Sequence, residues 1–181
     1  RSRDVEIDDF AAANCGVEIA WSEIMKSRFA GQPLKTISIS LNGETVRGEA
    51  MISNYGLEGG AVYALSTPIR KALATGYPVT VTIDLRPNHK IAEVTARLSE
   101  AKKGQSLANT LRKAGLSPEA ISLLRESGEL PTAPADLARR IKSTPVTITG
   151  QTGLERAISS SGGIARNGLD IGLMLKALPG V

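Results

Sequence analysis

The chain has 181 residues, 41% of them hydrophobic, so it can build a sizeable core and bury roughly 70% of its unfolded surface. Its formal net charge of +4 lies in one central segment, because residues 89–143 hold ten Lys or Arg and six acids while the remainder balances. No apolar run approaches the ~20 residues of a membrane span and no signal peptide precedes Arg1, which favours a cytoplasmic protein. Cys15 is the only cysteine and His89 the only histidine of the sequence. This excludes an internal disulfide, a thiolate cluster and most His-based catalytic or metal sites.

The first clear element is a β-hairpin. From Leu34 onward Ile37, Ile39 and Leu41 alternate with more polar residues, a period of two that indicates a half-buried strand. Asn42-Gly43 follows at once, and Asn-Gly is the preferred central pair of a type I′ turn. Residues 44–52 are therefore predicted to return as the antiparallel partner.

A glycine-rich loop comes next, within Ile52–Ser66. Gly56, Gly59 and Gly60 fall within five residues, between a strand pattern and a helix pattern that starts at Ala61. Glycine allows positive φ and close backbone approach, and the N–H groups at a helix start suit a negative or electron-rich group. The alternative interpretation is a strand-to-helix turn that binds nothing.

Two further elements precede residue 89. Thr67-Pro68 is predicted to supply the N-cap and first residue of a helix that Gly76 ends. The alternation of Val79, Val81, Ile83 and Leu85 then predicts another strand.

Helical periodicity replaces strand periodicity after His89. Four short helices are predicted, with stop or cap signals at Gly115, Ser117-Pro118 and Gly128. Their apolar positions are Ile91, Val94 and Leu98; Leu107, Leu111 and Ala114; Ile121 and Leu124; and Leu137 and Ile141.

The strand pattern resumes beyond Pro145 with Val146 and Ile148, and then on both sides of a predicted Gly162-Gly163 turn. Strands, helices and strands in this order predict an α+β fold in which a small helical bundle interrupts a β-rich unit. The predicted boundaries are 1–88 for the first part of the β-rich subdomain, 89–144 for the inserted helical subdomain and 145–181 for the return segment.

Three stretches carry a resemblance to a known family. They are the Tyr55-Gly56-Leu57-Glu58-Gly59-Gly60 loop, Trp21-Ser22-Glu23 with residues 28–35, and Ala157–Ile164 with its two glycines. Together they resemble the bacterial NAD(FAD)-utilising dehydrogenases, a flavoprotein family that includes aminoacetone-oxidase-like enzymes. Many members carry Thr-His where this chain has Ser53-Asn54, and Ser and Pro where it has Glu58 and Gly60, so no role of that histidine is carried over.

The resemblance implies a β-barrel-like subdomain interrupted by a helical subdomain, the whole inserted into an FAD-binding domain. No two glycines here are spaced i, i+2, so the G-x-G-x-x-G pyrophosphate turn is missing. The chain begins at Arg1 and stops about where such a family resumes its second FAD-binding segment. We therefore expect the insert domain of an FAD-dependent oxidoreductase, with FAD in the full-length protein and none bound to this chain alone.

On this interpretation the chain is the substrate-side cover of the flavin, whose cofactor supplies the chemistry. Its partners would be the FAD-binding domain of the same polypeptide and a small-molecule substrate that the sequence does not identify, with no nucleic acid and no membrane. We assign no catalytic residue and no metal, and expect the flavin-facing groups to offer backbone donors and close approach. The candidates are Tyr55, Gly56, Gly59, Gly60, Gly162 and Gly163. The alternative for these glycines is that they only permit turns in a barrel.

Two other classes of function stay open. Residues 106–114 and 117–126 around a Gly115-Leu116 turn are similar to a helix-turn-helix in a basic segment, which would suit a nucleic-acid-binding module. Against it, acids lie among these helices and neither an aromatic residue nor a dense Lys/Arg run accompanies them. A structural or protein-interaction domain, anchored through Trp21 and Phe29, is the third possibility.

Overall fold

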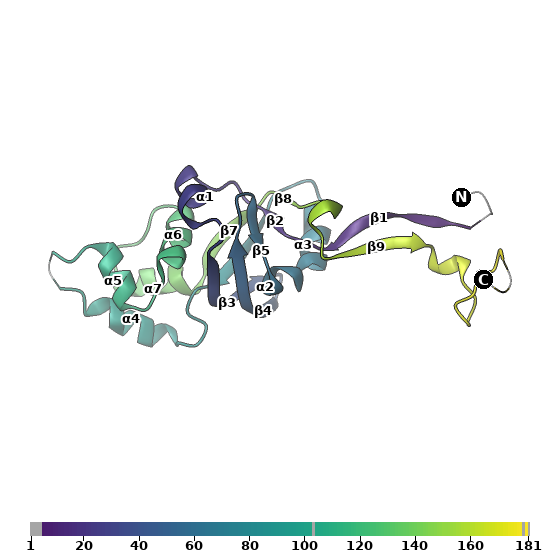
Figure 1. Ribbon diagram of the computed structural model, residues 1–181. Coiled ribbons are helices and arrows are strands. Elements are labelled where there is room, and N and C mark those ends of the chain that lie inside the picture. The colour runs from purple at the N-terminus through teal and green to yellow at the C-terminus, as the bar shows by residue number, and fades with distance from the viewer. Residues whose placement is uncertain (1–4, 103, 179, 181) are drawn as a thin grey trace.

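The computed structural model describes residues 5–102, 104–178 and 180. It shows an elongated molecule with helices at one end, a curled sheet in the middle and a two-stranded ribbon at the other end (Figure 1). Residues 1–4, 103, 179 and 181, which belong to the predicted subdomains 1–88, 89–144 and 145–181, lie outside the described residues.

The described residues form a seven-stranded sheet in the order β7-β6-β3-β4-β5-β2-β8, and each of its strand pairs is antiparallel. The strands are β2 (Val17–Glu18), β3 (Pro33–Leu41), β4 (Glu44–Ile52), β5 (Gly56–Glu58), β6 (Val79–Asp84), β7 (Thr144–Ile148) and β8 (Gly150–Gln151). The edge strands β7 and β8 follow one another with only Thr149 between them, and the Thr149 N–H donates to Glu18 O at 2.9 Å. The sheet therefore curls until its two edges meet in one bent segment, a barrel-like form without a closed ring of paired strands among the described residues.

The inside of the curl is filled with aliphatic side chains. Val17, Ile39, Leu57, Val81 and Ile148 come from five different strands and surround a space of only ≈ 10 Å³. The alternation predicted for β3 and β6 places Ile39 and Val81 on this side, because successive residues of a strand face opposite sides. Burial of this apolar surface is the main term that stabilises the fold.

The predicted hairpin is confirmed. Leu41 pairs with Glu44, and the two residues between them have positive φ, 50° for Asn42 and 87° for Gly43. Positive φ at both central positions matches a type I′ turn, whose twist suits the flanking strands.

Two helices close one side of the curled sheet. They are α2 (Gly60–Tyr63) and α3 (Ser66–Leu73), and Leu65 and Ile69 reach the space inside the curl. Thr67-Pro68 was expected to be the N-cap and first residue of a helix, but α3 starts two positions earlier with Leu65 as its N-cap. Pro68 is accommodated because it still lies in the first turn, where a missing N–H costs no helical hydrogen bond.

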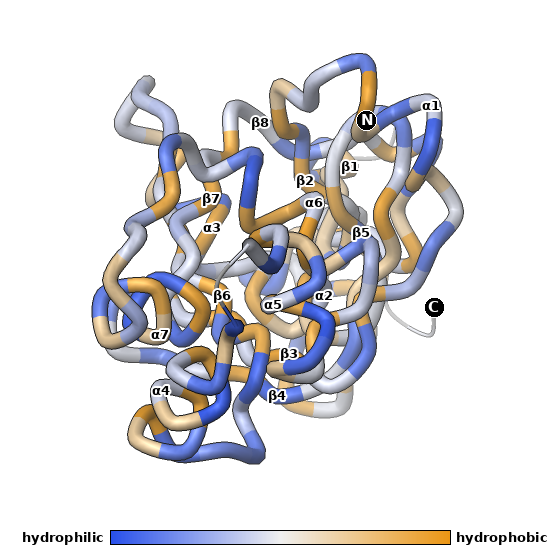
Figure 2. The backbone as a smooth tube through the Cα atoms, turned by 90° about the vertical axis from the view of Figure 1, so that its left-hand side faces the viewer, coloured by the Kyte–Doolittle hydropathy of each residue, from blue (hydrophilic) through white to orange (hydrophobic). Residues whose placement is uncertain are grey.

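The helical end consists of four helices between β6 and β7, joined by α1 (Glu23–Phe29). They are α4 (Ile91–Ser99), α5 (Leu107–Lys113), α6 (Pro118–Glu126) and α7 (Pro134–Lys142). The predicted cap is confirmed, since the Ser117 hydroxyl accepts from the Ala120 N–H at 3.4 Å with Pro118 at the first helical position. Figure 2, viewed from this end, shows hydrophobic and hydrophilic segments alternating along the helices and strands, as expected of amphipathic elements.

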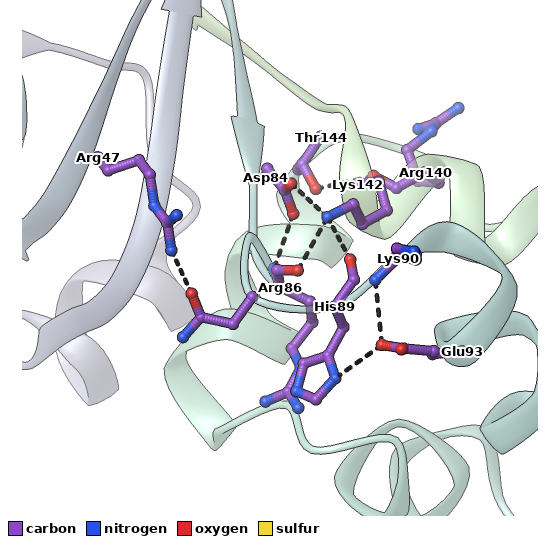
Figure 3. Close-up of polar contacts among 10 residues, drawn as sticks. Arg47, Asp84, Arg86, His89, Lys90, Glu93, Arg140, Lys142 and Thr144 are labelled. Atoms are coloured by element: carbon purple, nitrogen blue, oxygen red, sulfur yellow. Dashed lines mark hydrogen bonds and ion pairs between the residues drawn. The ribbon is translucent and has the colours of Figure 1, made fainter.

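Lys142 connects the helical end to the sheet. Its Nζ lies 2.6 Å from Asp84 Oδ2 and donates to the carbonyl oxygens of Arg86 and His89 at 2.9 and 2.7 Å (Figure 3). The side chains of Lys142 and Asp84 are only 19% and 18% exposed. One ammonium group thereby holds the end of β6, the segment that follows it and α7 together.

The ribbon pairs the two ends of the described chain. It consists of β1 (Ile7–Asn14) and β9 (Ser159–Ile164), which run antiparallel away from the sheet (Figure 1). The predicted turn at Gly162-Gly163 is wrong, because both glycines lie inside β9 and Gly163 pairs with Asp8. Their φ values of 106° and 96° accommodate an irregularity in the pairing rather than a chain reversal.

Candidate functional site

The glycine loop begins with a tight turn after β4. The Ser53 N–H donates to Gly56 O at 2.9 Å, and the Gly56 N–H donates back to Ser53 O at 3.3 Å. A Cβ at Gly56 would lie 1.9 Å from Val17 O, so only glycine lets β5 approach β2 this closely. Trp21 Nε1 donates to Gly56 O at 3.1 Å and fixes the same backbone from outside the sheet.

At Gly59 and Gly60 the chain passes from β5 into α2. Gly59 has φ 104° and its carbonyl accepts from the Val62 and Tyr63 N–H groups at 3.0 and 2.9 Å, which starts α2. Gly60 is exposed, and a Cβ placed there would meet no atom within 4 Å. The two neighbouring glycines thus differ: the positive φ of Gly59 favours glycine, whereas Gly60 borders open space.

Tyr55 is held by two charged side chains. Its phenol donates to Glu58 Oε2, and the Arg156 guanidinium carbon lies 4.7 Å from the ring centroid, in cation–π range. Arg156 comes from the short helix η1 (Leu154–Arg156), a hundred residues further along the chain. Burial, and then the hydrogen bond to the Glu58 carboxylate, raise the pKa of Tyr55 above its ordinary value.

These groups surround the point where the ribbon leaves the sheet. A Cβ at Gly16, just after β1, would touch the Tyr55 ring at 3.0 Å, and the Thr152 N–H donates to Gly16 O at 3.0 Å. On the other side Arg70 of α3 donates to Ala12 O at 3.0 Å. Tyr55 of the loop, α3 and the segment before η1 therefore all contact the base of the ribbon.

The six sequence-derived candidates occupy two places. Tyr55, Gly56, Gly59 and Gly60 lie in the segment from the end of β4 to the start of α2, of which Tyr55 reaches the base of the ribbon, whereas Gly162 and Gly163 lie within the ribbon against Asp9 and Phe10. The structure does not bring the two groups into one pocket, and contact of either with a flavin stays a prediction. Sequence reasoning missed Arg156, because no local pattern indicates which distant cation covers an aromatic ring.

The acid–base groups of this site are few. Tyr55 and Glu58 form a phenol–carboxylate pair that can hold or pass a proton. Cys15 is fully buried and burial raises the pKa of its thiol, which disfavours the reactive thiolate. Among the described residues no group of three or more His, Cys, Asp or Glu could hold a metal ion, and no helix is long and apolar enough to cross a membrane.

The second of the two helices that resemble a helix-turn-helix faces inward. Residues 120–124 of α6 are all buried, so the helix that would enter a DNA groove is packed inside the protein. Trp21 is likewise 5% exposed and belongs to the core, with Phe29 packed against it. These placements give no support to the nucleic-acid or aromatic-anchor interpretations.

Comparison with protein families identifies the family of this chain. The family model described as "HI0933-like protein barrel and H2TH domain" matches residues 11–159, most of the chain. A search of curated proteins found no match. The matched range includes the curled sheet, the helical end and the glycine loop.

Proposed function

The chain belongs to the HI0933-like barrel and H2TH domain family, an insert domain of FAD-utilising oxidoreductases, and we propose that it covers the flavin held by the separate FAD-binding domain of the same polypeptide. In this proposal the ribbon joins the two domains and the Tyr55–Gly60 loop faces the flavin. The small-molecule substrate would bind between them.

The ribbon is the observation that carries the proposal. Domain insertion is favoured when the two ends of the inserted domain lie close together, and β1 and β9, which lead into and out of this domain, are paired with each other. The ribbon also exposes apolar side chains: Phe10 is 64% exposed, the paired residues Ile7 and Ile164 are 40% and 48% exposed, and Ile158, just before β9, is 65% exposed. Exposed apolar side chains on neighbouring strands would be covered by contact with another protein surface.

The loop suits a cover rather than a complete cofactor site. Gly60 leaves open space beside a rigid backbone, and the chain has no G-x-G-x-x-G turn to hold a pyrophosphate. FAD, when bound by the other domain, would supply the redox chemistry. The residues of this chain would exclude water, orient the substrate and keep a proton at the Tyr55–Glu58 pair.

Gly60→Leu in the full-length protein tests the proposal. The Cβ of the new side chain would meet no atom of this domain, so folding should be unaffected while any close partner surface is pushed away. We expect a changed flavin spectrum or slower flavin reduction with an unchanged melting temperature. Ala96→Leu, at an exposed position of α4, is the control for added bulk. A Gly60→Leu protein that binds FAD and turns over like the parent would refute the placement of this loop.

A further inference from the structure

A second candidate site lies at the junction of the sheet and the helical end, away from the ribbon. A cleft of ≈ 410 Å³ opens there between the first half of β3, the segment 85–89 after β6, and the start of α6. Its apolar wall includes Leu34, Ile37, Leu85 and Leu116. Nothing in the proposed function uses this cleft.

Arg86 lines the cleft with a charge that the protein does not compensate. Its Nη1 donates to Gly115 O at 2.7 Å, but its Nε is buried and has no hydrogen-bond partner. The nearby Asp84 does not serve it, because one carboxylate oxygen accepts from the Arg86 backbone N–H at 2.8 Å and the other pairs with Lys142. Burial and the neighbouring Arg97 lower the pKa of Arg86, as expected for a desolvated cation without a counter-charge.

Two further cations, Lys35 and Arg47, add positive charge to the cleft and its surroundings. Lys35 lines the cleft and has no ion pair with any described residue. Arg47 lies in a groove that continues past Lys35, and its guanidinium donates to the neutral side chain of Asn88, itself part of the cleft wall (Figure 3). The opposing carboxylates are Glu119 in the cleft and Glu49 in the adjoining groove. The titratable His89, which contacts Glu93 at 3.3 Å, also lines the cleft.

We propose that this cleft binds a small organic phosphate monoester. The phosphate would be placed between Arg86 and Lys35, since a doubly charged group matches more than one unpaired cation and Arg binds phosphate well. The volume leaves room for an organic part, which would lie on the apolar wall. The bound phosphate would supply the counter-charge that the guanidinium of Arg86 does not have among the described residues.

Phenyl phosphate is the probe, titrated into the ¹⁵N-labelled 181-residue chain at about 0.15 M salt, where diffuse surface attraction is screened. We expect saturable amide shifts around residues 34–37, 85–89 and 115–120. Benzoate and inorganic phosphate should bind more weakly, because each lacks one of the two recognised parts. Arg86→Gln should weaken binding by about tenfold, the loss of one charge-assisted hydrogen-bonded contact.

Two variants leave the contacts of Arg86 intact and keep the test decisive. Lys35→Gln should weaken binding, and Glu119→Gln should tighten it, because it removes the opposing carboxylate in the cleft. Arg139→Gln, an exposed arginine already paired with Asp136, is the control and should change nothing. The proposal fails if no saturable shifts occur, if Arg139→Gln weakens binding as much as Lys35→Gln, or if benzoate binds as tightly as phenyl phosphate.

Discussion

Gly56 and Gly60 are four positions apart in one loop, yet only one of them has no room for a side chain. Gly56 is pressed against the backbone of β2, whereas Gly60 borders open space. A glycine-rich stretch therefore combines positions needed for folding with positions free for contact. Substitution of each glycine by alanine, which adds one methyl group, distinguishes the two kinds of position.

Gly56→Ala should destabilise this chain by about 3 kcal/mol or more, because its Cβ would lie 1.9 Å from Val17 O and the strands must move apart. Gly60→Ala should be neutral or stabilising by about 0.5 kcal/mol, through lower entropy of the unfolded chain. Denaturant unfolding of both variants measures the difference. Equal effects would contradict the assignment of Gly56 as the packed position.

Tyr55 is expected to make the stability of the folded protein depend on pH in the alkaline range. Its pKa in the folded protein is raised above the ordinary 10.0, so its contribution to stability is present below pH 10 and is lost as the pH rises through the folded-state pKa. The free energy of unfolding of the parent should thus fall more steeply above pH 10 than that of Tyr55→Phe. Parallel curves for the two proteins would show that the phenol does not titrate in this way.

At the scale of elements, the β3–β4 hairpin depends on positive φ at its turn. Gly43 has φ 87°, so Gly43→Val should cost about 1 to 2 kcal/mol. Gly43→Asn should cost less, because asparagine tolerates the left-handed region. Thermal or urea unfolding of the pair provides the measurement, and the reverse order of stability would argue against a strained turn.

The attachment of the helical end depends on Lys142. Lys142→Met would leave Asp84 and two carbonyl oxygens without their donor, and we expect a loss of about 2 to 3 kcal/mol. Lys26→Met, in an exposed ion pair with Glu23, should cost no more than about 0.5 kcal/mol. A Lys142 variant as stable as the Lys26 control would mean that packing alone holds the junction.

At the scale of the whole molecule, one core continues from the curled sheet into the helical end. Buried residues of both parts belong to a single hydrophobic cluster, which includes Ile83 of β6 and Ile141 of α7. The segment that leads from α7 back into the sheet is part of a strand, since Pro145 lies in β7 and pairs with Thr82. The subdomain boundaries at residues 88/89 and 144/145 therefore stay a prediction, and the two subdomains that they separate share one core.

The ribbon should behave differently in this chain and in the full-length protein. If it joins the FAD-binding domain and its apolar residues pack there, amides of β1 and β9 should exchange hydrogen at least about tenfold more slowly in the full-length protein. Exchange mass spectrometry of both proteins measures this. Amides of β6, inside the sheet, are the internal control and should exchange alike; equal exchange in the ribbon as well would contradict burial at a domain interface.

Patterns that depend on neighbouring residues determined much of this protein. The Asn42-Gly43 turn, the Ser117-Pro118 helix start and the alternation in β3 and β6 were all readable, because turns, caps and strand faces are decided within a few residues. The α+β class follows from the order of those patterns. The family resemblance came from other local motifs, among them the Tyr55–Gly60 loop.

Contacts between distant segments were decided only by the tertiary structure. Gly162-Gly163 looks like a turn locally, yet pairing with β1 makes it part of a strand. Nothing near Tyr55 indicates that Arg156 covers its ring, and nothing near Arg86 indicates that Asp84 is already occupied by Lys142. Such partners are chosen by how strands and helices pack after the chain has turned back on itself, so their identity depends on the whole arrangement and on no single stretch of sequence.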